Sequence, residues 1–171
     1  MSKARVKVAN ATYTGKKQKP VPAVSVDGVA LAKGTDFTVS YKNNVNAGKA
    51  TLVVKGKGAY TGSKTVTFEI AKAKPVVKAK KASVKLKRAK VKKKAQVVAN
   101  LRVTCDKGKA VYKNASSGAA KKFKVNKKTG KVTVPKYTKK GTYTVKVKVS
   151  VKAGANYKKL TKTVKLKVKV V

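Results

Sequence analysis

The 171-residue chain has no histidine, a single cysteine and only four acidic residues. With one thiol, Cys105, no disulfide can form within the chain, and without histidine no Cys/His set is available to hold a metal ion. Carboxylate pairs for general acid–base chemistry are scarce, and no Ser/His or Cys/His pair could activate a nucleophile. These absences argue against catalysis and against a bound metal or cofactor. Cys105 follows Leu101 and Val103 at strand spacing, so we interpret it as a small buried hydrophobic side chain.

Long apolar runs are also missing from the sequence. No stretch approaches the roughly 20 apolar residues of a membrane-spanning helix. Residues 1–7 lack the apolar segment of a secretion signal. Two interpretations stay open at this point: a cytosolic protein, or a fragment of a secreted protein that has been given a new start.

Positive charge is what the chain has in excess. Lysine and arginine total 46 against 4 acids, which gives a formal net charge of +42, so internal salt bridges cannot neutralise the chain. High net charge with low hydrophobicity is typical of disorder. Here 42% of the residues are apolar, close to the globular average, and they recur at strand spacing between glycine and asparagine turns. We therefore predict a folded chain with a core.

The clearest pattern lies at the end of the chain. Residues 145–149 and 164–170 alternate valine or leucine with lysine, which is typical of a strand with one buried and one exposed face. A Gly-Asn connection at 153–157 joins them into an antiparallel hairpin. We expect the lysines of the two strands to lie opposite one another, an arrangement of like charges that costs stability.

Short strands with frequent turn signals fill the rest of the chain. Asp27-Gly28 is a hairpin turn signal, and no helical period is present. About seven short strands in the first half predict a β-sandwich. We interpret the basic run 87–94 as a strand end and loop rather than as a helix or a nuclear-targeting signal.

A lysine/proline joint at 71–75 marks the domain boundary. We predict domains at 1–72 and 76–171 with a short linker at 73–75. Both domains end on the same plan of glycine, strand, Gly-x(x)-Tyr and strand, as in two divergent copies of one sandwich. The tyrosines of this plan, Tyr60 and Tyr157, are expected to be core residues.

Several motifs of the first domain occur together: Tyr13-Thr-Gly15, Lys19-Pro20, and the runs 31–41, 43–48 and 56–62. With these motifs, residues 4–71 resemble a bacterial immunoglobulin-like repeat found in secreted and cell-wall proteins of Gram-positive bacteria. Residues 75–171 more loosely resemble the lysine-rich immunoglobulin-like or cadherin-like modules of such proteins, through 126–130, 140–143 and 153–157.

The resemblance implies an all-β fold of two tandem immunoglobulin-like β-sandwich domains. It also implies a secreted or bacterial cell-surface setting, with signal and anchor outside this chain, and a spacer or adhesive role. It carries over no catalytic residues and favours the fragment interpretation. The near absence of acids departs from the family pattern, so natural extreme charge and deliberate supercharging both stay open.

The lysine-covered strands predict binding to anionic polymers, namely teichoic acid, nucleic acid or a sulfated glycan. Lysine far outnumbers arginine, which argues against base-specific recognition, and no aromatic row is present for stacking bases. The expected binding residues lie in the basic run and the terminal hairpin: Lys87, Arg88, Lys90, Lys92, Lys94, Lys146, Lys148, Lys165, Lys167 and Lys169.

Three functions remain in competition. The first is a structural cell-surface module whose lysines hold it against anionic wall polymers. The second is a dedicated polyanion binder, natural or engineered for delivery. The third is a subunit of an extracellular filament in which exposed strands pair between copies. Repulsion between the charges would favour a monomer, while the third function requires assembly.

Overall fold

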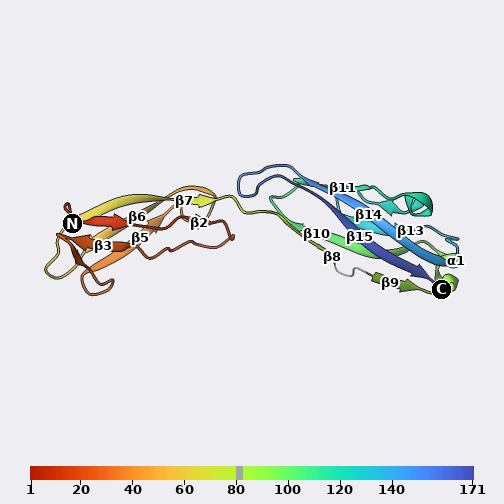
Figure 1. The fold of residues 1–171 in the computed structure, drawn as a ribbon, viewed down its shortest axis with the longest axis horizontal. Helices are drawn as coiled ribbons and strands as arrows, with labels where there is room; N and C mark the ends of the chain where they lie inside the picture. Colours follow the sequence, from red (N-terminus) through yellow and green to blue (C-terminus); the bar gives the residue numbers. More distant parts are fainter. Residues whose placement is uncertain (80–82) are drawn as a thin grey trace. The chain divides into compact units, whose positions relative to one another are not determined.

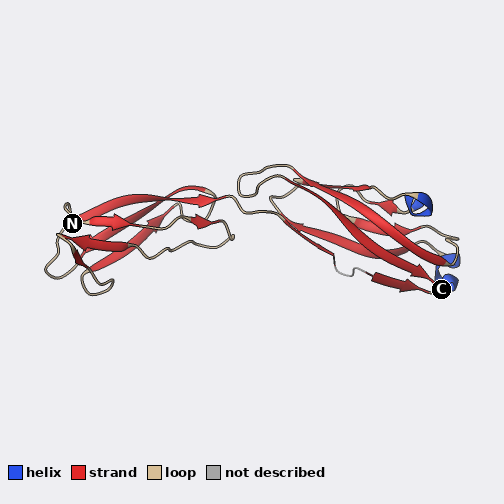
Figure 2. Ribbon diagram, in the orientation of Figure 1, coloured by secondary structure: helices blue, strands red, loops and turns tan. Residues whose placement is uncertain are grey.

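A computed structural model describes residues 1–79 and 83–171. Strands dominate throughout, with one short α-helix and one short 3-10 helix among the described residues (Figure 2). The chain divides into two compact units, Met1–Ala73 and Lys74–Val171. In the described residues, neither helix is long and apolar enough to cross a membrane.

The first unit consists of two sheets that enclose a small core (Figure 1). One sheet has the order β1 (Arg5–Lys7), β3 (Ala23–Val26) and β4 (Val29–Ala30). The other has the order β2 (Ala11–Thr12), β7 (Ser63–Ala71), β6 (Gly48–Gly56) and β5 (Phe37–Lys42).

The core of this unit follows from strand alternation. Phe37, Leu52 and Ile70 point inward from their strands and are at most 1% exposed. The predicted hairpin turn joins β3 to β4, where Asp27 and Gly28 both have positive φ, 48° and 85°. Two central residues of positive φ define the tight turn whose twist matches paired strands.

The second unit also consists of two sheets. The first has the order β12 (Lys124–Val125), β13 (Lys131–Val134), β10 (Gln96–Thr104) and β8 (Val76–Ala79). The second has the order β11 (Ala110–Asn114), β14 (Gly141–Val151), β15 (Leu160–Val170) and β9 (Ser83–Leu86). Valines of β13 and β14, together with Leu101 and Leu166, make the buried layer between the sheets. The short helices are α1 (Arg88–Lys93) and the 3-10 helix η1 (Gly118–Lys122).

One strand plan recurs in both units. The first strand of each unit pairs antiparallel with a later strand of its own sheet: β1 pairs with β3, and β8 pairs with β10. The chain then crosses to the other sheet and pairs parallel with the final strand, as β2 does with β7 and β9 does with β15. Each final hairpin begins at a glycine, Gly48 opposite Ile70 and Gly141 opposite Val170. The two pairs of sheets confirm the predicted fold class, an all-β chain of two tandem β-sandwich domains.

Two sequence-based expectations are wrong. The basic run 87–94 is not a strand end and loop, because residues 88–93 form α1. Val91 of this short helix is fully buried in the core. No side chain caps the N-terminal end of α1, whereas the Gln96 side-chain amide donates to the carbonyls of Lys90 at 3.2 Å and Lys94 at 3.1 Å at its C-terminal end. Tyr60 and Tyr157 lie in the hairpin connections, are only partly buried, and belong to neither hydrophobic core.

A candidate polyanion-binding surface

The outer face of the β11–β14–β15–β9 sheet carries the lysines of the terminal hairpin. Inward positions such as Val145, Val147 and Leu166 are buried, and the alternate positions point outward. The lysines on the outer face are Lys85, Lys113, Lys146, Lys148, Lys165, Lys167 and Lys169. No acidic residue stands at an outward position of these four strands.

The register turns these lysines into a continuous diagonal, which we call the lysine band. At one end Lys85 is opposite Lys169. The band follows β15 through Lys167 to Lys165 and crosses to its partner Lys146 on β14. It ends where Lys148 is opposite Lys113 on β11. Figure 1 shows the two long central strands, β14 and β15, side by side in blue.

Hydroxyl side chains border the band on both sides. Thr142 and Thr144 of β14 lie opposite Lys169 and Lys167, and Thr163 of β15 lies opposite Lys148. The expectation that the hairpin lysines oppose one another therefore holds for Lys146 and Lys165 only. Elsewhere the register offsets the two lysine series, which replaces repulsion across the pair by a lysine–threonine contact.

The predicted residues of the basic run lie beside one end of the band. The backbone N–H of Arg88 donates to the carbonyl of Val171 at 2.6 Å, so α1 begins where β15 ends. Figure 1 shows α1 next to the C-terminus. Lys87, Lys90, Lys92 and Lys94 are exposed there. Arg88 is partly buried, and among the described residues its Nε finds no hydrogen-bond partner.

Two lysines of the band, Lys85 and Lys113, escaped the sequence analysis. Each belongs to a short edge strand in which only one lysine faces outward, so neither stands out as an alternating run. Their contribution depends on pairing with distant strands. Only the register of β9 on β15 and of β11 on β14 places them in line with the others.

The four acids occupy positions that the fold uses. Asp27 holds a positive φ in its turn, and Asp36 accepts a hydrogen bond from the N–H of Ala32 at 2.8 Å. Glu69 lies opposite Lys49 in the first unit. Asp106 accepts a hydrogen bond from the N–H of Asn156 at 3.2 Å. The remaining negative charge thus serves turns and strand pairing.

Three titratable groups, one thiol and two phenols, have pKa values shifted by burial. Burial, and secondarily the charge of Asp106, raises the pKa of the Cys105 thiol, which leaves less of the nucleophilic thiolate. Burial also raises the pKa of the Tyr41 and Tyr112 hydroxyls. Among residues 1–79 and 83–171, no three acidic or cysteine side chains gather as a metal site would require.

The fold and this surface define a class: tandem β-sandwich modules, one of which presents a cationic sheet face. No family model matches the chain, and no curated protein matches it. Among solved structures it is similar to Drosophila N-cadherin EC1-4, with a TM-score of 0.48 and 12% identity over 96% of this chain and 47% of that one.

The chain is also similar to two further solved structures. Extracellular cadherin domains 1-4 of protocadherin gamma B7 give a TM-score of 0.48 and 13% identity over 96% of this chain and 49% of that one. Domains 4 and 5 of the S-layer protein SbsC give a TM-score of 0.38 and 16% identity over 98% and 97%. The chain spans about half the length of the two cadherin structures. Identities at this level concern the fold alone.

Proposed function

We propose that this chain is a non-catalytic, strongly cationic module of a bacterial surface protein, part of a stalk or adhesive, that binds anionic polymers without sequence specificity. The lysine band is the observation that carries the proposal. It is a continuous row of ammonium groups, without an acid among them, on a sheet face bordered by hydroxyls.

The geometry of the band suits an extended polymer. Successive outward residues of one strand lie about 6.6 Å apart, and opposite residues of paired strands are closer still. A linear polyanion laid along the diagonal would meet a lysine at each step. Each neutralised anionic group releases condensed counterions, so affinity is high at low salt and falls as salt rises.

The residue types favour charge recognition over sequence recognition. Lysine presents a compact, mobile ammonium group, whereas bidentate hydrogen bonding to bases or phosphates is typical of arginine. The threonines beside the band offer hydroxyls that bond to many kinds of polar group. We expect teichoic acid, nucleic acid and sulfated glycans all to bind, and we expect the charge to keep the module monomeric.

The proposal is tested with two triple variants of equal charge change. Lys165, Lys167 and Lys169 are replaced by threonine in one variant, and the exposed Lys16, Lys17 and Lys19 of the first unit in the other. Heparin affinity is then measured against salt. The band variant should lose more affinity, and its slope of log K against log salt should fall by roughly two to three. Equal losses in the two variants would mean that net charge alone, with no preferred surface, accounts for binding.

A further inference from the structure

A cavity of about 400 Å³ lies in the second unit, and none of its lining residues belongs to the lysine band. It is lined by η1, the start of β14 and the segment 135–139. Three aromatic rings and three lysines line it: Phe123, Tyr137, Tyr143, Lys122, Lys136 and Lys139. Its volume falls within the range of about 300–1,000 Å³ that is usual for small-ligand sites.

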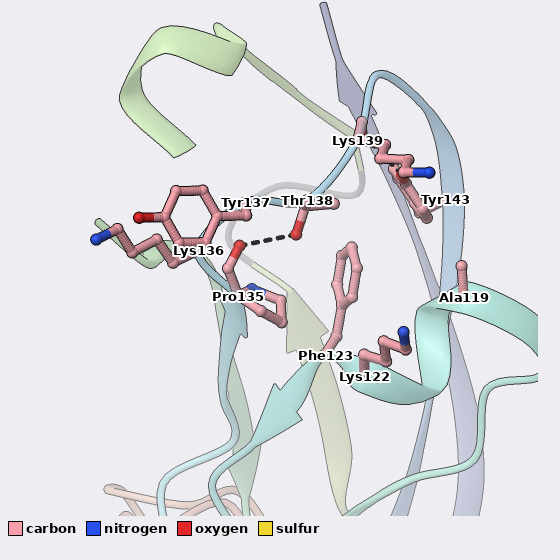
Figure 3. A pocket seen from close by; sticks show the side chains of 9 residues that line it. All are labelled: Ala119, Lys122, Phe123, Pro135, Lys136, Tyr137, Thr138, Lys139 and Tyr143. Atoms are coloured by element: carbon pink, nitrogen blue, oxygen red, sulfur yellow. Dashed lines mark hydrogen bonds between the residues drawn. The ribbon is translucent and has the colours of Figure 1, made fainter. Parts of the chain in front are cut away.

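Three side chains that line the cavity are held by contacts within the chain. The rings of Phe123 and Tyr143 are in contact, with centroids 5.3 Å apart. The Tyr143 hydroxyl donates to the carbonyl of Lys139 at 2.8 Å, and the Thr138 hydroxyl donates to the carbonyl of Pro135 at 2.7 Å. Figure 3 shows Tyr137 and Lys136 on one side of Phe123, and Lys139 and Tyr143 on the other.

Tyr137 is the unusual residue of this cavity. Its side chain is 66% exposed and its backbone is left-handed, with a φ of 64° that bulky residues rarely adopt. Its N–H donates to the carbonyl of the buried Val91 at 3.1 Å, which ties the segment to α1. The fold therefore holds an aromatic ring in solvent at a backbone position where glycine or asparagine would be less strained.

The chemistry of the lining favours a ligand that carries both an anionic group and hydroxyl groups. The lysines and the absence of any acid among the lining residues call for an anionic group. Lys136 already places its ammonium 4.6 Å from the centroid of the Tyr137 ring. The hydroxyl oxygens of Thr138 and Tyr143 donate their hydrogens to carbonyls, so toward a ligand they offer lone pairs that accept from its O–H groups.

We propose that this cavity, the Tyr137 pocket, binds a saccharide unit that carries an acidic group. The C–H face of the sugar lies against the Tyr137 ring, its hydroxyls donate to Thr138 and Tyr143, and its acid lies among the lysines. This inference rests on the proposed function and deepens it by naming a ligand class with a discrete site. A nucleic-acid strand suits the pocket less well, because a single exposed ring provides no row for successive bases.

The test uses the full chain and short probes that cannot span the band. The probes are a hyaluronan tetrasaccharide with carboxylates, N-acetylglucosamine 1-phosphate, neutral chitotetraose and a thymidine tetranucleotide. Amide shifts of the labelled protein are followed at about 0.15 M salt, where exposed charges are largely screened. We expect the acidic saccharides to shift residues 118–123 and 135–143, and the stronger of the two to show whether carboxylate or phosphate is preferred.

Variants separate this inference from the proposed function. Tyr137→Gly removes the ring and suits the left-handed backbone, so it should lower saccharide affinity about tenfold without a loss of melting temperature. Tyr137→Gly should leave the binding of long heparin at low salt unchanged. The band triple variant should lower the affinity for heparin and leave the affinity for the short acidic saccharides unchanged. Equal binding of chitotetraose, tighter binding of the tetranucleotide, or unchanged saccharide affinity in Tyr137→Gly would each overturn the pocket assignment while leaving the band's role intact. If neither Tyr137→Gly nor the band triple variant lost affinity for heparin, that result would instead count against the proposed function.

Discussion

Gly130 lies in the turn before β13, at a place that leaves no room for a side chain. Its φ is 68°, and a Cβ there would come within 2.8 Å of the Leu101 carbonyl oxygen and of the Tyr112 ring. Gly108 has a similar φ of 74° with nothing within 4 Å. The two positions therefore separate backbone strain from steric conflict.

We predict that Gly108→Ala lowers the free energy of unfolding of the second unit by about 1 kcal/mol, the cost of a left-handed alanine. Gly130→Ala should cost about 2–3 kcal/mol more, because the Leu101 backbone and a core ring would have to move. Urea titrations of both variants measure the difference. Equal costs would show that the turn adjusts freely.

Cys105 gives a pH-dependent prediction. Its pKa is raised by burial first and by Asp106 second, so the folded protein keeps the thiol proton to a higher pH than the unfolded chain does. Stability should therefore fall as the pH rises above the thiol's ordinary value of about 8.5. Cys105→Ala should lessen that fall, as measured by urea unfolding at a series of pH values. An identical fall in wild type and variant would assign it entirely to other groups.

At the scale of the strand pair, Lys146 and Lys165 lie directly opposite one another, while Lys167 faces Thr144. Like charges at opposed positions destabilise a sheet by a few tenths of a kcal/mol to about 1 kcal/mol, and salt screens them. We predict that Lys165→Glu raises the free energy of unfolding more than the matched Lys167→Glu does. The gap should shrink in about 1 M salt. A larger gain at Lys167 would mean that this register is wrong.

Alternation was enough to predict the strands but not their alignment. Valine–lysine alternation in 145–149 and 164–170 identifies both strands and their buried faces, and both belong to β14 and β15. The connection between β14 and β15 is too long for turn type to fix the register. The pairing of lysines with threonines, and with it the diagonal band, therefore appears only in the folded chain.

The basic run 87–94 shows the opposite limitation. Most residues of this run are lysines, and Val91 does not stand out among them in the sequence. In the structure Val91 is buried and the run forms a short helix. Val91 is the only large apolar residue of the run, and one such residue gives no period, so nothing in the local pattern distinguishes helix from loop. The pocket could not be predicted from the sequence either, because its three aromatic residues come from separate segments of the chain: Phe123, Tyr137 and Tyr143.

At the scale of the whole molecule, the structure shows how the positive and negative charges are distributed. The net charge of +42 predicts polyanion affinity from composition alone. The structure adds that three of the acids serve turns, Asp106 among them in the second unit, and that Glu69 lies opposite Lys49 in the first unit. One sheet of the second unit aligns its lysines. The chain therefore combines a fold maintained by its apolar layers with a sheet face on which lysines are aligned.

Salt dependence of polyanion binding tests this account most directly. The full chain is titrated with two double-stranded DNAs of unrelated sequence and with heparin, from about 0.05 to 0.2 M salt. The account predicts linear, steep falls of log K with log salt, and the same affinity for the two DNAs at every salt concentration, because counterion release supplies the binding. A shallow slope for all three polymers, or one DNA sequence still bound where the other is lost, would contradict the claim that aligned lysines bind anionic polymers by charge alone.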